Sequence, residues 1–120
     1  MKLATKIGAL ILSVATFGTA FAGDETGNWR RPNGDTVAVS VRGGGLYCTI
    51  TAGRRVGFEM CHGMRNSAAD VWQGRTMKHP SMPGFMTFNG TVTISGNNLE
   101  IKGCAIGQGM CDKEKWTKLN

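Results

Sequence analysis

Short runs of alternating apolar and polar residues, separated by glycine-rich turns, are the feature that most restricts how this chain can fold. Residues 35–42 show the pattern clearly, because Val37, Val39 and Val41 would point to one side of a strand and the residues between them to the other. Such alternation is typical of a strand buried on one face. Similar runs recur about every 10 residues, and no helix of normal length is expected. We therefore expect an all-β domain.

Further strands are expected at residues 46–52, 56–61, 71–77, 85–94, 99–104 and 110–119. Residues 62–69 fit either an irregular loop or one short helical turn, and we favour the loop. About eight short strands with regular turns predict an antiparallel meander that closes as a small barrel or sandwich. Closure removes the sheet edges that would otherwise recruit other chains.

The first 22 residues have the features of a signal peptide. Lys2 and Lys6 form a positive segment, residues 7–15 are largely apolar, and the segment ends in Ala20-Phe21-Ala22. The apolar run is shorter than the roughly 20 residues that span a bilayer. We expect a signal peptide at residues 1–22 and an exported domain at residues 23–120 that does not span the membrane. Its expected location is the periplasm, and secretion remains an alternative.

Removal of 22 residues from 120 leaves 98, which is one domain so small that its core needs additional support. The domain contains four cysteines, and an even number in an oxidising compartment indicates disulfides. The expected pairs are Cys48–Cys61 and Cys104–Cys111, because each pair lies symmetrically about a predicted hairpin turn.

The net charge of +6 includes Lys2 and Lys6, so the mature domain carries +4. Its positive residues are scattered along the chain, as ordinary solubility charge would be. A mildly basic exported domain can also meet an anionic envelope component. Nucleic acid is not an expected partner in this compartment.

Several short motifs are spread over nearly the whole mature chain. They are Gly27-Asn28-Trp29, Leu46-Tyr47-Cys48, Trp72-Gln73-Gly74 with Pro80, residues 99–104, Cys111 and Trp116-Thr117-Lys118. In this order they resemble domain-of-unknown-function family 2147, which consists of small exported bacterial proteins with a lipocalin-like fold. The resemblance implies a lipocalin-like barrel with a G-x-W motif in the first strand and a W-x-basic ending on the last, and it brings no established chemistry. Lys118 stands where the family usually has arginine, and it can still cover an indole face by a cation–π contact.

Trp29, Trp72, Trp116 and Lys118 are candidate ligand-binding residues. The three indoles could line a pocket for an apolar ligand or a sugar. Alternatively, they could fill the core. We favour this interpretation because aromatic side chains dominate small cores by their area.

Methionine and histidine cluster in two segments, and thioether and imidazole together suit Cu(I). On a proline-bent loop, some of these side chains could converge on one ion. The alternative, which we favour, is that the methionines fill gaps in the core. The candidate metal ligands are His62, Met64, Met77, His79, Met82 and Met86.

No arrangement of carboxylate, serine and histidine residues suggests catalysis, so we do not expect an enzyme. The leading hypothesis is a non-catalytic periplasmic binding or envelope-associated module without a cofactor, whose partner is a small ligand or an anionic envelope component. One alternative is a protein that binds copper or another soft metal through the methionine and histidine loops. Another is a protein-interaction module. The oligomeric state stays open.

Overall fold

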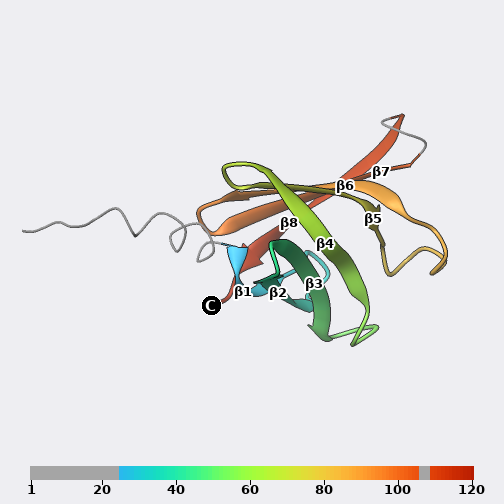
Figure 1. Ribbon diagram of the computed structural model, residues 1–120. Helices are drawn as coiled ribbons and strands as arrows, with labels where there is room; N and C mark the ends of the chain where they lie inside the picture. The colour runs from blue at the N-terminus through green and yellow to red at the C-terminus, as the bar shows by residue number, and fades with distance from the viewer. Residues whose placement is uncertain (1–24, 106–108) are drawn as a thin grey trace, which may run out of the picture.

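The computed structural model describes residues 25–105 and 109–120, so the predicted signal peptide at residues 1–22 lies outside the described residues. The chain forms a closed barrel of eight antiparallel strands, in which each strand pairs with the next and β8 returns to β1 (Figure 1). The predicted all-β barrel is confirmed. The strands are β1 (Gly27–Arg30), β2 (Thr36–Arg42), β3 (Gly45–Ala52), β4 (Glu59–Ala68), β5 (Val71–Met77), β6 (Phe88–Ser95), β7 (Asn98–Ala105) and β8 (Met110–Lys118).

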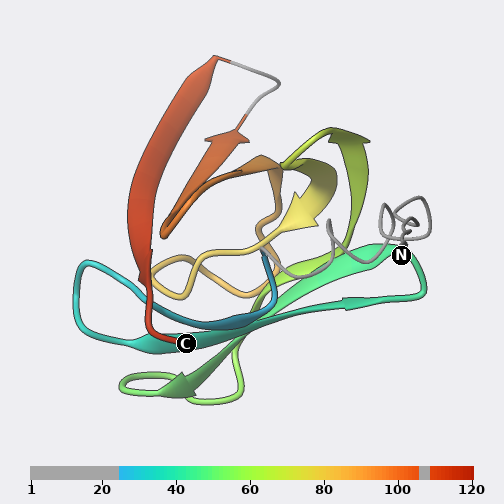
Figure 2. The same ribbon diagram turned by 90° about the vertical axis from the view of Figure 1, so that its left-hand side faces the viewer.

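The alternation in the sequence decides which side chains fill the barrel. Val37 and Val39 are buried and Val41 packs against the core, as the period of two predicts. The same rule places Leu46 and Ile50 inside. Seen from the end at which the C-terminus lies, the strands surround this interior (Figure 2).

The barrel closes through β1 and β8. Trp29 lies opposite Lys118 in the register. The backbone N–H of Asn28 donates to the carbonyl of Asn120 at 2.9 Å, and the N–H of Leu119 donates to the carbonyl of Asn28 at 2.8 Å. Lys118 Nζ lies 5.1 Å from the centre of the Trp29 ring, so the predicted cation–π contact is confirmed.

Both predicted disulfides are confirmed. Cys48 lies opposite Cys61 across β3 and β4, and Cys104 lies opposite Cys111 across β7 and β8. Cys48 and Cys61 are fully buried in the barrel, whereas Cys111 is exposed. The first disulfide therefore belongs to the core, and the second fastens a hairpin at the surface.

The prediction of a loop at residues 62–69 is wrong, because β4 continues to Ala68. The alternation is interrupted at Gly63, whose φ of +65° favours glycine. The pairing of β3 with β4 shifts register between Leu46 and Cys48, close to this glycine. A bulge of this kind changes which face each following side chain occupies, so a strict period of two misses the strand.

Two predicted strands begin later than expected. Residues 56–58 form part of a turn, in which the N–H of Phe58 donates to the carbonyl of Arg55, and β4 begins at Glu59. Residues 85–87 belong to the loop that follows Pro80 and Pro83, and β6 begins at Phe88. Both loops are longer than the sequence pattern predicted, and they lie at the same end of the barrel.

The two ends of the barrel differ, and we name them by their connections. The turn end carries the start of β1, the C-terminus and the short turns at residues 43–44, 69–70 and 96–97. The loop end carries the connections at residues 31–35, 53–58, 78–87 and 106–109, of which 106–108 lie outside the described residues. Across residues 25–105 and 109–120, no helix is long and apolar enough to span a membrane.

Candidate functional site

A pocket of about 260 Å³ lies at the loop end. This volume is just below the roughly 300–1,000 Å³ of typical small-molecule sites, so it suits a small ligand or part of a larger one. Its lining includes both apolar and polar side chains, and we call these two sets the apolar wall and the polar wall. The apolar wall consists of Met60, Met77, Met82, Phe88 and Ile101, and the polar wall of His79, Ser81, Asp112, Lys113 and Glu114, with Gly103 also lining the pocket.

Two glycines in neighbouring strands make room for Met77. A Cβ atom at Gly90 would lie 2.7 Å from Met77 Sδ and 2.9 Å from Met77 Cβ. A Cβ atom at Gly103 would overlap the terminal methyl group of the same side chain. Gly90 and Gly103 are directly paired between β6 and β7. They form a shallow floor on which Met77 lies, only 5% exposed, and this fixes one part of the apolar wall.

Arg31 holds the polar wall in place from the first loop of the loop end. Its Nε donates to Glu114 Oε1 at 2.8 Å, and its Nη1 donates to Asp35 Oδ2 at 2.8 Å. Trp116 Nε1 also donates to Glu114 Oε1, at 2.7 Å. Arg31 is only 6% exposed, so it is a buried cation that two carboxylates neutralise.

The electrostatics of this cluster keep all three groups ionised. Burial opposes the charge of Glu114, but hydrogen bonds from Arg31 and Trp116 and the Arg31 charge outweigh it and lower the pKa. The backbone N–H of Arg54 is the largest cause of the lowered pKa of Asp35, with Asn33 and Arg31 adding to it against burial. Burial also opposes the charge of Arg31, yet the two carboxylates raise its pKa. The trio therefore carries a net charge of −1.

His79 is held in place by hydrogen bonds at Nδ1. The backbone N–H of Ser81 donates to Nδ1 at 3.1 Å, and Ser81 Oγ lies 2.7 Å from the same atom. Nδ1 is thus an acceptor, and the hydrogen of a neutral ring is on Nε2. Nε2 lies 3.6 Å from Glu114 Oε2 and 3.4 Å from Arg31 Nη2. The ring is oriented by these contacts and presents no free lone pair to the pocket.

Among the described residues, large side chains pack inside the barrel near the turn end. Trp29 is fully buried, and its Nε1 donates to the carbonyl of Glu25 at 3.0 Å. Trp72 Nε1 donates to Glu25 Oε2 at 3.1 Å. Glu25 is 1% exposed, and its Oε1 has no hydrogen-bond partner among the described residues. Indoles and a buried carboxyl group occupy the interior near this end.

The four residues predicted as ligand-binding lie outside the pocket. Trp29, Trp72 and Trp116 are buried in the core, and Lys118 packs over Trp29 at the turn end. Trp116 reaches the pocket only indirectly, through its hydrogen bond to Glu114. A direct role of these residues in binding stays a prediction.

The six residues predicted as metal ligands separate into two groups. Met77, His79 and Met82 line the pocket, joined by Met60. Met64 is buried in the core, Met86 does not line the pocket, and His62 is on the outside. His62 Nδ1 lies 2.7 Å from Glu59 Oε1, and its ring meets the Tyr47 ring edge-on at 5.0 Å between centres. Among the described residues, no group of three or more histidine, cysteine or acidic residues could hold a metal ion.

Sequence reasoning did not find Arg31, Asp35 or Glu114 as site residues. Arg31 and Glu114 are 83 positions apart, and their pairing depends on the closure of β8 onto β1. One sequence signal was present. Arg31 and Asp35 flank a proline, an asparagine and a glycine, and these residue types indicate a turn that brings its two ends together.

We compared the chain with known protein families, characterised proteins and solved structures, and no match was found in any of the three.

Proposed function

We propose that this protein is a non-catalytic binding module of the periplasm, and that it takes a small amphipathic ligand into the pocket at the loop end. The signal-peptide pattern at residues 1–22 supports export, and the two disulfides are compatible with an extracytoplasmic location. A lipocalin-like relationship fits the closed eight-stranded barrel, and membership of family 2147 is part of this proposal.

The observation that carries the proposal is that apolar and charged side chains line the same pocket. The three methionines Met60, Met77 and Met82 offer flexible, polarizable contacts to an apolar group. Glu114, which lines the same pocket, belongs to a trio with a net charge of −1. A ligand with an apolar part and a positive or hydrogen-bond-donating group satisfies both walls, whereas a carboxylate would be repelled by Glu114.

Native mass spectrometry of the protein purified from its own periplasm tests this proposal. We expect the wild-type protein to carry a bound ligand, detected as added mass. We expect the Glu114→Gln variant to retain less of this ligand. The matched control is Glu59→Gln, which removes a carboxylate outside the pocket. Equal loss in both variants, or a ligand-free wild-type protein that also fails to bind short alkylammonium ions, would contradict the proposal.

A second candidate is a soft metal ion such as Cu(I), favoured by the convergence of Met60, Met77 and Met82 on one pocket. Thioethers alone would supply the ligands, because Nδ1 of the neutral His79 ring accepts hydrogen bonds and its Nε2 carries the hydrogen. An anaerobic Cu(I) competition titration tests this candidate. We expect Met82→Leu to weaken binding more than His79→Gln. Affinity no greater than that of a free methionine-containing peptide would remove the candidate.

A further inference from the structure

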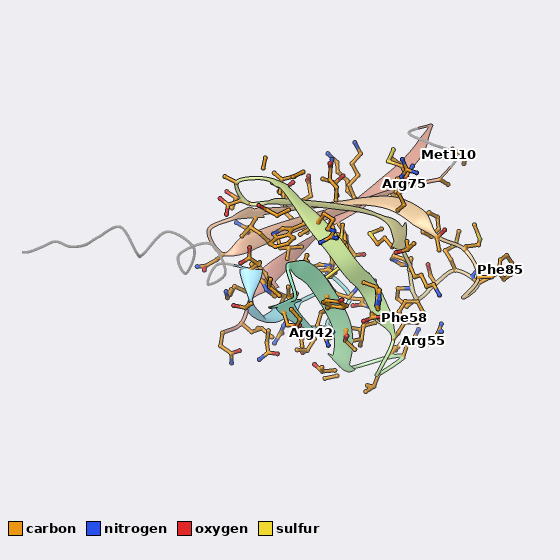
Figure 3. All side chains as sticks on the ribbon, in the orientation of Figure 1. Arg42, Arg55, Phe58, Arg75, Phe85 and Met110 are labelled. Carbon is orange, nitrogen blue, oxygen red and sulfur yellow. A yellow bond between two sulfur atoms is a disulfide. The ribbon has the colours of Figure 1, made fainter. Side chains whose placement is uncertain are left out.

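Exposed apolar side chains gather at the tips of the loop end. Val56 lies on the β3–β4 loop and is 63% exposed, Phe85 lies on the β5–β6 loop and is 86% exposed, and Met110 begins β8 and is 65% exposed. Figure 3 shows Phe85 and Met110 on the side of the molecule away from the C-terminus. Three separate connections thus present an apolar tip at the same end of the barrel.

Cations accompany these tips. Arg54 and Arg55 precede Val56, and Lys78 begins the loop that carries Phe85. The described residues of the four loop-end connections include one acidic residue, Asp35. It is 4% exposed and bound to Arg31. Glu59, at the start of β4, is paired with His62. The exposed charge of these loops is therefore positive.

The loops are tied to one another. Arg55 Nη1 donates to the carbonyl of Pro80 at 2.6 Å, which joins the β3–β4 loop to the β5–β6 loop. The same guanidinium lies 4.8 Å from the centre of the Phe58 ring. Met82, on the same loop as Phe85, lines the pocket and is 39% exposed. Arg55 therefore joins the two loops that carry Val56 and Phe85, and this part of the loop-end rim lies beside the pocket.

We propose that this rim, formed by Arg54, Arg55, Val56, Lys78, Phe85 and Met110, docks the loop end onto an anionic lipid bilayer. Apolar tips that enter the headgroup region, flanked by arginine and lysine, are the combination that binds such a surface. Charge complementarity favours a membrane over a second copy of this chain, whose corresponding rim is also positive. The inference goes beyond the proposed function, because these six residues do not line the pocket.

Vesicle co-sedimentation of the exported, processed protein tests the inference. We expect binding to vesicles that contain phosphatidylglycerol, weakening with added salt, and little binding to phosphatidylcholine alone. Each cation near an anionic surface contributes about fivefold to partitioning, so the double change Arg54→Gln and Arg55→Gln should reduce binding about 20-fold. Phe85→Ser should reduce it about tenfold, since it removes a large apolar tip.

The turn end provides matched controls. Leu119 is 41% exposed there, and Arg42 lies over the Tyr47 ring at 3.9 Å, as Arg55 lies over Phe58. Leu119→Ser and Arg42→Gln should leave vesicle binding unchanged. Orientation is measured with brominated lipids, which should quench the new indole of Phe85→Trp and not that of Leu119→Trp.

Three outcomes would overturn the inference. They are no binding to anionic vesicles at low salt, equal losses from rim and turn-end changes, and a Phe85→Ser change that alters only the oligomeric mass in ultracentrifugation. The last would identify a second copy of the chain as the occupant.

Discussion

Arg31 is the residue that connects the barrel wall to the candidate pocket. It is buried, it pairs with Asp35 in its own loop, and it reaches Glu114 on β8. A buried guanidinium is costly unless its hydrogen bonds are made, so these two carboxylates are required for its position. The polar wall of the pocket is therefore a structural element as well as a candidate binding surface.

The free energy of unfolding should depend on pH through Asp35 and Glu114. The pKa values of Asp35 and Glu114 are lower in the folded protein than in the unfolded chain, where they are about 3.9 and 4.3. The stability they contribute is fully present above those unfolded values and is lost as the pH falls through the folded ones. We expect the free energy of unfolding to be level above about pH 6 and to decrease below about pH 5. Urea denaturation at a series of pH values measures it.

A variant separates this cluster from the remaining carboxylates. Glu114→Gln should lower the stability at pH 7 by about 1–2 kcal/mol, because Arg31 loses a charged acceptor. The same change should flatten the decrease in acid. Glu100→Gln, which alters a carboxylate 3.9 Å from Lys113 at the surface, should do neither. An acid profile that is identical in wild type and Glu114→Gln would contradict this assignment.

The second prediction concerns the glycine floor beneath Met77. Gly90→Ala should destabilise the fold by about 1–3 kcal/mol, since its Cβ would meet the fixed Cβ of Met77. Gly103→Ala should cost less than about 1 kcal/mol, because it meets only a terminal methyl group that can swing away. Thermal denaturation compares the two. A larger loss from Gly103→Ala would contradict the assigned packing.

At this scale the sequence predicted the disulfide partners, its family resemblance predicted that Lys118 covers an indole face, and the buried trio was missed. Cysteine symmetry and the W-x-basic ending are local patterns. The burial of Arg31, in contrast, results from its encounter with Glu114 after the barrel closes. Charged residues are mostly exposed, so composition alone assigned Arg31 to the solubility charge.

Hairpins are the elements that the sequence specifies best. Both disulfides join residues that are directly opposite in adjacent strands, so each is determined by the register of one turn. Only residues 59–61 of strand β4 were predicted as strand, because the bulge near Gly63 breaks the period of two. The starts of β4 and β6 were placed too early, since Val56 and Phe85 are apolar yet exposed on loops. Apolar residues at a surface rim cannot be distinguished from strand residues by periodicity.

The third prediction compares the two disulfides. Closing loops of these lengths contributes about 3 kcal/mol for Cys48–Cys61 and about 2.5 kcal/mol for Cys104–Cys111 by chain entropy alone. The paired change of Cys48 and Cys61 to alanine should cost clearly more than that of Cys104 and Cys111, because its loop is longer and both of its cysteines are fully buried, whereas Cys111 is exposed. Chemical denaturation of both double variants measures the difference. Equal losses would contradict the assignment of Cys48–Cys61 to the core.

The whole molecule is a barrel with two unlike ends. Indoles and the carboxyl group of Glu25 lie in the interior near the turn end, while the loop end holds a pocket lined by apolar and charged side chains. Sequence patterns predicted the closed barrel, because alternation and turn spacing are properties of the whole chain. They did not predict which end holds the pocket, since that depends on how long loops pack on one another. The proposed function therefore requires that ligand binds in the pocket at the loop end.

Methionine methyl groups provide built-in probes of that requirement. Carbon-13 NMR of methyl-labelled methionine can follow Met60, Met77 and Met82 in the pocket and Met64 in the core during titration with hexylammonium, with hexanoate as the matched anion. We predict that hexylammonium shifts the three pocket signals and leaves Met64 in place, and that hexanoate has a much weaker effect. A saturating shift at Met64 without shifts at Met60, Met77 and Met82, or stronger binding of hexanoate, would contradict the account.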